Sequence, residues 1–187
     1  PSGCGKTTLL NILGGLDHPT TGSVDIETTE ITSMKDSELI DFRLNNIGFV
    51  FQAYNLIPVL TTFENVEFIM LLQKQDKKQR HARVMELLDE MGIADKANQR
   101  PSELSGGQQQ RVAVARALAS RPKVILADEP TANLDSKSTS NLLDMMAQMN
   151  KEEKATFVFS THDQRVIDKA KRIVTLQDGK VISDEKV

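Results

Sequence analysis

The sequence is poor in several residue types, and each shortage excludes a class of protein. Among its 187 residues are one cysteine, one tyrosine and no tryptophan. The single cysteine cannot form an internal disulfide, which is compatible with a reducing compartment. No stretch approaches the roughly 18 uninterrupted apolar residues of a membrane-spanning helix. Basic residues are not in excess either, and the net charge of −3 argues against a nucleic-acid-binding surface.

The remaining composition is that of a globular chain. Hydrophobic residues make up 39% and charged residues 26%, and the length suits one sizeable core. The basic segment 74–83 is interpreted as a solvated helix face or turn, with nucleic-acid binding as the less favoured alternative. The composition therefore predicts one domain, and the function has to be sought in motifs.

The segment Leu104–Gln108 (LSGGQ) is the first informative motif. Two glycines allow a backbone to approach a ligand closely, and residues 109–119 are expected to form a helix. The beginning of a helix presents N–H groups without partners and a partial positive charge, which together suit a phosphate. Ser105, Gly106, Gly107 and Gln108 are therefore candidate phosphate-binding residues.

A buried strand ending in two carboxylates is the second motif. The run 124–127 (VILA) is typical of a strand covered on both faces, and it brings Asp128 and Glu129 to its carboxyl end. Asp128 is predicted to hold Mg²⁺ and Glu129 to polarise the water that attacks a γ-phosphate. The alternative for Glu129 is a structural acid that caps a helix or forms a salt bridge. A phosphate cradle and a carboxylate pair together predict an ATPase that uses ATP and Mg²⁺.

The chain begins on a third motif. Residues 1–7 (PSGCGKT) are a P-loop whose first glycine is missing, and this pattern predicts an N-terminally truncated fragment whose stability alone is poor. Lys6 is expected to reach the β- and γ-phosphates, and the Thr7 hydroxyl to coordinate Mg²⁺. Cys4 occupies a variable position of the loop.

Gln52 and His162 are further candidates, because each follows a predicted strand. The Gln52 amide can contact both Mg²⁺ and water, and His162 can donate a hydrogen bond to a γ-phosphate. Considered alone, each is as easily an ordinary structural residue, and only the surrounding motifs favour the catalytic role.

Strands and helices alternate along the chain, which predicts a largely parallel, covered sheet. The sequence predicts helices at 8–15, 36–45, 138–149 and 164–171, two amphipathic helices between 64 and 91, strands at 23–31, 47–51, 124–127 and 156–160, and a hairpin at 173–183 with a primed turn at 178–179.

The two phosphate-binding segments raise a geometric difficulty. A helical insertion separates them, so one chain is not expected to fold both onto one nucleotide. A head-to-tail homodimer resolves this, with the 104–108 segment of one subunit closing on the ATP that the other subunit holds. The expectation is a symmetric dimer with two ATP molecules at its interface.

Assembled in this order, the motifs resemble the nucleotide-binding domain of ABC transporters along essentially all 187 residues. The resemblance implies an α/β P-loop NTPase fold with a RecA-like core, a mostly parallel sheet and some antiparallel strands. The core would comprise residues 1–52 and 101–187, and residues 53–100 would form an inserted helical subdomain that ends near the signature, 104–108. The Walker A segment extends to Thr8, and Asp135 belongs to the D-loop.

The segments 48–52, 55–58 and 64–66 are similar to those of the subfamily of LolD- and MacB-like ATPases, which serve lipoprotein release and macrolide efflux. The resemblance implies a groove near residues 54–58 that receives a transmembrane permease, and a location in the cytoplasm on the inner face of the membrane. Nucleic acid is not expected as a partner. The predicted nucleotide contacts are Ser2, Gly3, Cys4, Gly5, Lys6, Thr7, Thr8, Gln52, Ser105, Gly106, Gly107, Gln108, Asp135 and His162. The predicted metal contacts are Thr7, Gln52 and Asp128, and the predicted catalytic residues are Glu129, His162 and Gln52.

Two alternatives remain open at this point. One is an ABC-type ATPase that acts on ribosomes or DNA instead of driving transport. The other is a nucleotide-binding module without catalytic activity, although the presence of Glu129, Gln52 and His162 argues against it.

Overall fold

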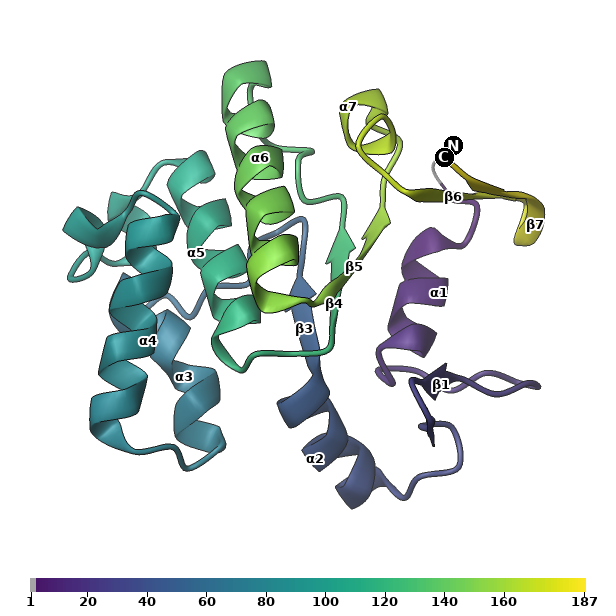
Figure 1. Ribbon diagram of the computed structural model, residues 1–187, viewed down its shortest axis with the longest axis horizontal. Coiled ribbons are helices and arrows are strands. Elements are labelled where there is room, and N and C mark those ends of the chain that lie inside the picture. The colour runs from purple at the N-terminus through teal and green to yellow at the C-terminus, as the bar shows by residue number, and fades with distance from the viewer. Residues whose placement is uncertain (1–2) are drawn as a thin grey trace.

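Three parallel strands form the centre of the computed structural model, which describes residues 3–187 (Figure 1). The strands β3 (Ile47–Val50), β4 (Val124–Asp128) and β5 (Thr156–Ser160) pair in this order, with Ile47 opposite Val124 and Asp128 opposite Ser160. Their apolar runs suit burial on both faces. The predicted parallel sheet is confirmed.

Helices cover both faces of this sheet. Because successive side chains of a strand point to opposite faces, Leu126 packs in one core and Ile125 in another. Leu126 lies with residues of α1 (Lys6–Leu13) and α2 (Asp36–Asn46), whereas Ile125 lies with residues of α5 (Gly106–Ala119) and α6 (Ser136–Glu153). The central layer is thus enclosed between two helical layers.

Two helices in segment 53–100 extend the core that lies on the α5 side. They are α3 (Thr62–Leu72) and α4 (Lys77–Glu90), followed by the 3₁₀ turns η1 (Ala94–Lys96) and η2 (Pro101–Glu103). Each helix has a side-chain N-cap, Thr61 for α3 and Asp76 for α4. The two predicted amphipathic helices are confirmed.

The predicted strand at 23–31 is wrong as a single element. The segment is a hairpin of two short strands, β1 (Asp25–Ile26) and β2 (Thr29–Glu30), with Glu27 in a left-handed conformation at φ 54°. Val24, Ile26 and Ile31 all contribute to the core on the α1 side. The more buried residues alternate on each side of the turn, but the two exposed turn residues 27–28 shift the alternation by one position, from 24 and 26 to 29 and 31.

The carboxyl-terminal part matches the prediction in one element and departs from it in another. The predicted helix at 164–171 is only the short α7 (Gln164–Ile167), since the residues after it are mostly charged and exposed. The predicted hairpin is confirmed as β6 (Arg172–Gln177) and β7 (Lys180–Lys186). Asp178 and Gly179 both have positive φ, 49° and 76°, as a type I′ turn requires.

Among residues 3–187, no helix is both long enough and apolar enough to cross a membrane.

Candidate functional site

The polar candidates gather at one edge of the central sheet. The strands β3, β4 and β5 end there, and α1, α5 and α6 begin there (Figure 1). This follows from the parallel topology, in which every connecting helix runs antiparallel to the strands that flank it. The edge therefore combines strand-end side chains with the positive ends of several helices.

The P-loop leads directly into α1. Gly3 and Gly5 have φ of 82° and 90°, which favours glycine at both positions, and Gly5 is the N-cap of α1. The helix begins at Lys6, two residues before the predicted start, so that Thr7 and Thr8 lie in its first turn. Lys6 Nζ lies 3.6 Å from Cys4 Sγ. Ser2 lies outside the described residues.

Thr7 and Asp128 come together across 121 residues of sequence. The Thr7 hydroxyl donates to Asp128 Oδ2 over 2.9 Å, at a cavity of about 190 Å³ whose lining includes both residues. The other carboxylate oxygen, Oδ1, is buried and has no hydrogen-bond partner among the described residues. An uncompensated carboxylate oxygen is costly to bury, and a hydroxyl beside a carboxylate is the oxygen donor set that Mg²⁺ prefers. These two residues fit the predicted cation.

Gln52, the third predicted metal contact, has a different observed partner. The backbone carbonyl of Gln52 accepts a hydrogen bond from Asn133 Nδ2 over 3.0 Å, and Gln52 is exposed. Within the part of the chain that the structure describes, no hydrogen bond joins its side chain to Thr7 or Asp128.

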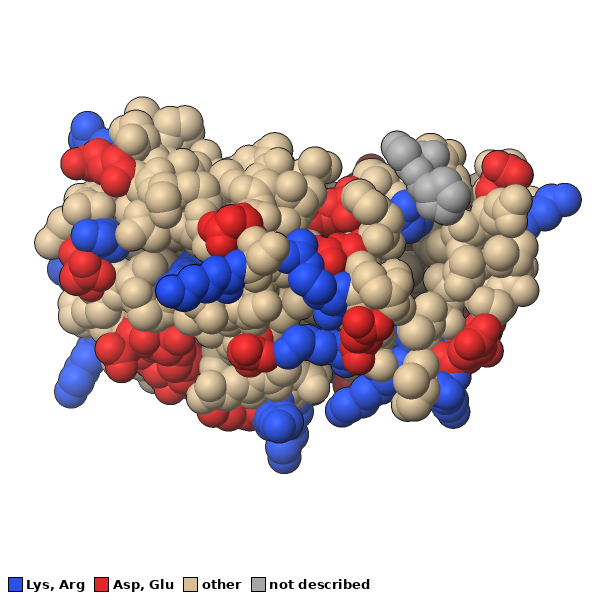
Figure 2. Space-filling view, turned by 90° about the horizontal axis from the view of Figure 1, so that it is seen from above, with Lys and Arg blue, Asp and Glu red and all other residues tan. Residues whose placement is uncertain are grey.

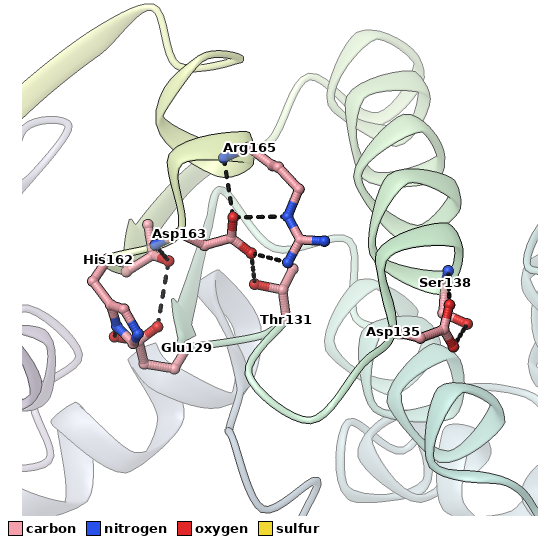
Figure 3. Close-up of polar contacts among 8 residues, drawn as sticks. Glu129, Thr131, Asp135, Ser138, His162, Asp163 and Arg165 are labelled. Carbon is pink, nitrogen blue, oxygen red and sulfur yellow. Dashed lines mark hydrogen bonds and ion pairs between the residues drawn. The ribbon is translucent and has the colours of Figure 1, made fainter.

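Glu129 follows β4 in a left-handed conformation with φ 46°, an unusual and strained geometry for glutamate. Its N–H donates to the carbonyl of Ser160 over 2.8 Å, which fixes it against the end of β5. Its side chain is 15% exposed, and Oε1 lies 2.7 Å from Nδ1 of the 72% exposed His162 (Figure 3). Since a carboxylate only accepts, His162 donates through Nδ1. The structure thus brings two predicted catalytic residues into contact.

The sequence reasoning missed a second network, which begins at Asp163, the residue after His162. Asp163 follows His162 and accepts hydrogen bonds from Thr131 Oγ1 at 3.0 Å and from two nitrogens of Arg165 at 2.9 and 2.7 Å (Figure 3). The bonds from Arg165 lower the pKa of Asp163 to about 2. Asp163 also caps α7, and the spacing Asp-x-Arg at a helix start was the available signal. The network links the loop after β4 to the loop after β5.

The signature segment forms the beginning of α5. The helix starts at Gly106 rather than at residue 109, and Ser105 and Gln108 form a reciprocal capping box with distances of 3.3 and 2.9 Å. A Cβ on Gly106 would lie 3.0 Å from the Tyr54 hydroxyl. α5 and α1 lie on opposite faces of the sheet, so the signature and the P-loop do not meet within one chain (Figure 1).

Asp135 caps α6. Oδ1 accepts from the Ser138 N–H at 2.9 Å and Oδ2 from the Ser138 hydroxyl at 2.7 Å, and these bonds lower the pKa of Asp135 (Figure 3). Both of its oxygens thus have partners within the chain.

The surface at this edge carries mixed charge. Figure 2 looks onto the upper side of Figure 1 and shows acidic and basic side chains interleaved, with no continuous basic face. This pattern lacks the basic footprint of a nucleic-acid interface.

Comparisons with known proteins agree with this geometry. Residues 1–132 match the family model described as ABC transporter. The lipoprotein-releasing system ATP-binding protein LolD 1 of Chlorobium chlorochromatii is 45% identical, over 100% of this chain and 76% of its own length. The macrolide export ATP-binding/permease protein MacB of Rhodopseudomonas palustris is 46% identical, over 98% of this chain and 28% of its own length.

A solved structure extends the likeness to three dimensions. The dimeric, post-hydrolysis state of the ATP-binding cassette MJ0796, bound to ADP and Pi, superposes with a TM-score of 0.91 at 45% identity. The match covers 100% of this chain and 82% of that one. MJ0796 comes from Methanocaldococcus jannaschii.

Proposed function

The chain belongs to the ABC transporter family, and we propose that it binds and hydrolyses ATP to power a membrane permease. One observation carries this proposal. Thr7 in the first turn of α1 contacts the partly unpartnered Asp128 at the end of β4, and Glu129, directly after β4, contacts His162, which follows β5. This arrangement combines a phosphate cradle, a cation site and a base.

Each residue would have one role in hydrolysis. The N–H groups of segment 3–8 bind the phosphates, and Lys6 neutralises part of their charge. Glu129 accepts the proton of the attacking water, and His162 holds the Glu129 carboxylate in place through Nδ1. Thr7, Asp128 and Gln52 would hold Mg²⁺, and the bound ion would supply charge compensation for the phosphate oxygens.

A second copy of the chain would complete each site. The likeness to the dimeric MJ0796 cassette and the separation of α1 from α5 support a head-to-tail dimer with two ATP molecules. In it, residues 105–108 of one protomer cover the nucleotide on the other, and Asp135 lies at the junction. The capped start of α5 presents backbone N–H groups to that phosphate.

The organisation and location belong to the same proposal. Residues 1–52 and 101–187 form a RecA-like core, and residues 53–100 form a helical subdomain whose groove near residues 54–58 receives the permease. The protein then lies in the cytoplasm on the inner face of the membrane. The relatives named for lipoprotein release and macrolide export support a transporter of that type.

The test is Glu129→Gln in the full chain, with Glu185→Gln as a matched control on the exposed strand β7. We expect the first variant to lose steady-state hydrolysis by at least about 100-fold and to accumulate as an ATP-bound dimer in size-exclusion chromatography. The control should keep wild-type turnover. Turnover within a few-fold of wild type in Glu129→Gln would show that the base is another residue.

A further inference from the structure

The loop after β3 has an unusual backbone. Tyr54 and Asn55 are consecutive and both left-handed, with φ of 60° and 50°. Asparagine tolerates this conformation, but tyrosine adopts it rarely, so the surrounding structure has to hold it there. Tyr54 is also the only tyrosine among the 187 residues.

One side chain holds both carbonyls of this turn. Arg116, half-buried on α5, donates through Nη1 to the Asn55 carbonyl over 2.6 Å and through Nη2 to the Tyr54 carbonyl over 2.9 Å. Burial lowers the pKa of Arg116, but a guanidinium remains charged at any physiological pH. Both bonds are therefore charge-assisted, and the rigid fork of the guanidinium defines the relative direction of the two carbonyls.

The same loop has two further attachments. The Tyr54 hydroxyl lies against Gly106, where a Cβ would be only 3.0 Å away, and Asn133 donates to the Gln52 carbonyl over 3.0 Å. Segment 52–55 thus contacts the start of the signature helix, the last turn of that helix and the loop after Glu129. These contacts connect elements that the sequence separates by about 50 to 80 residues.

We propose that Arg116 is a positioning residue for ATP hydrolysis, which keeps the 54–55 turn and with it Gln52 in a fixed relation to α5. This proposal rests on the proposed function, because a residue can position the site only if the chain hydrolyses ATP. Arg116 itself would take no part in the chemistry. Lysine cannot replace arginine in this role, because a single ammonium group does not present two donors in one plane. The effect should fall on turnover rather than on ATP affinity.

The experiment is Arg116→Lys in the full chain, with Arg111→Lys as the matched control. Arg111 also lies on α5 and also donates to a backbone carbonyl, that of Met91, over 3.1 Å. We expect Arg116→Lys to lower kcat at least 10-fold with KM for ATP changed less than threefold. Arg111→Lys should leave both within threefold of wild type.

A fluorine label separates positioning from general destabilisation. With 3-fluorotyrosine at position 54, Arg116→Lys should shift or broaden the ¹⁹F resonance while thermal unfolding matches that of Arg111→Lys. An unchanged resonance, or a kcat equal to that of the control, would overturn the proposal. Glu129→Gln, measured in parallel, separates failure of this proposal from failure of the proposed function. If Glu129→Gln leaves turnover intact, the proposed function itself is wrong.

A second variant covers the case in which Arg116→Lys does not fold. Asn133 is exposed, so Asn133→Ala should fold and still release the other end of the same loop. We expect it to move the Tyr54 resonance and to lower kcat several-fold. Where both single variants fold, the double variant should lose less than the product of the two effects. An unmoved resonance, or independent effects, would contradict a shared role in positioning this loop.

Discussion

Two parts of the molecule are built in opposite ways: the strand-end site, which is Thr7, Asp128, Glu129 and His162, and the helical region, which is residues 53–100 with α3 and α4. At the site, Glu129 is held in a left-handed conformation, one Asp128 oxygen is buried without a partner among the described residues, and His162 is exposed. In the helical region, Leu87 and Leu88 of α4 are completely buried. Two adjoining parts of one fold thus differ in strain, exposure and polarity.

Asn65 shows how the helical region satisfies a fully buried polar side chain. Its side-chain amide is buried. Oδ1 accepts from the Ile57 N–H, and Nδ2 donates to the carbonyls of Ile57, Leu60 and Thr61. A buried polar group with every partner present stabilises a loop, whereas one without a partner is available to a ligand. The helical region thus contributes buried apolar side chains and a saturated buried amide, whereas the strand ends hold strained and exposed polar residues, as the proposed function requires.

The largest effect on stability should come from Leu87→Ala. Removing a fully buried leucine leaves a cavity in the core shared by α3, α4 and α5, which costs about 2–5 kcal/mol of unfolding free energy. Urea unfolding measures this, and hydrolysis by the folded fraction at low temperature should stay near the wild-type value. A large loss of turnover with little loss of stability would show that Leu87 contributes to hydrolysis rather than to the fold.

His162→Ala should show the opposite pattern. We expect turnover to fall roughly 100-fold because the Glu129 carboxylate loses its 2.7 Å partner. The free energy of unfolding should change by less than about 1 kcal/mol, since the side chain is 72% exposed. Steady-state ATPase kinetics measure the loss of turnover, and urea unfolding of the same variant measures the change in stability. His18→Ala, in an exposed loop, is the control.

Asp163→Asn should reveal a pH-dependent contribution of intermediate size. The pKa of Asp163 in the folded chain, about 2, lies below its ordinary value of 3.8, so the fold favours the charged carboxylate. The contribution of this ion pair, about 1 kcal/mol given the exposure of Arg165, should be present above pH 4 and decline as the pH falls toward 2. Denaturation of wild type and variant at pH 6, 4 and 3 measures it. A stability difference that grows as the pH falls would contradict this assignment.

Glu90→Gln should have the smallest effect, and Glu90 is an exception within the helical region, as is Nε of Arg83 on the same helix. Burial raises the pKa of Glu90, with a smaller contribution from the neighbouring Glu86, and one carboxylate oxygen has no partner among the described residues. A raised carboxyl pKa weakens the fold as the pH rises through it, so the variant should gain up to about 1 kcal/mol at pH 7 and less at pH 4. A loss of stability at pH 7 would show that the Glu90 charge has a favourable partner.

Local pattern predicted most elements, and it failed where tertiary contacts decide. The strand at 156–160 and the primed turn at 178–179 follow from short-range preferences, and both were predicted correctly. The hairpin at 25–30 was predicted as one strand because alternation is present on each side of the turn, and the one-residue shift at 27–28 was not recognised as a turn. The helix at 164–171 ends early because the residues after Ile167 have no core to cover.

The candidate site also has features that local sequence predicts and features that only tertiary contacts decide. Glycine spacing and the apolar run before Asp128 are local, so the sequence by itself determined the two glycine-containing segments, the strand-end carboxylates and the family. Contacts over long separations were decided only by the tertiary structure, among them Thr7 with Asp128, Glu129 with His162 and Arg116 with the 54–55 turn. No periodicity encodes such pairs, because they depend on which strands become neighbours in the sheet. They also depend on the direction that the chain takes after each strand when the helices pack on the sheet.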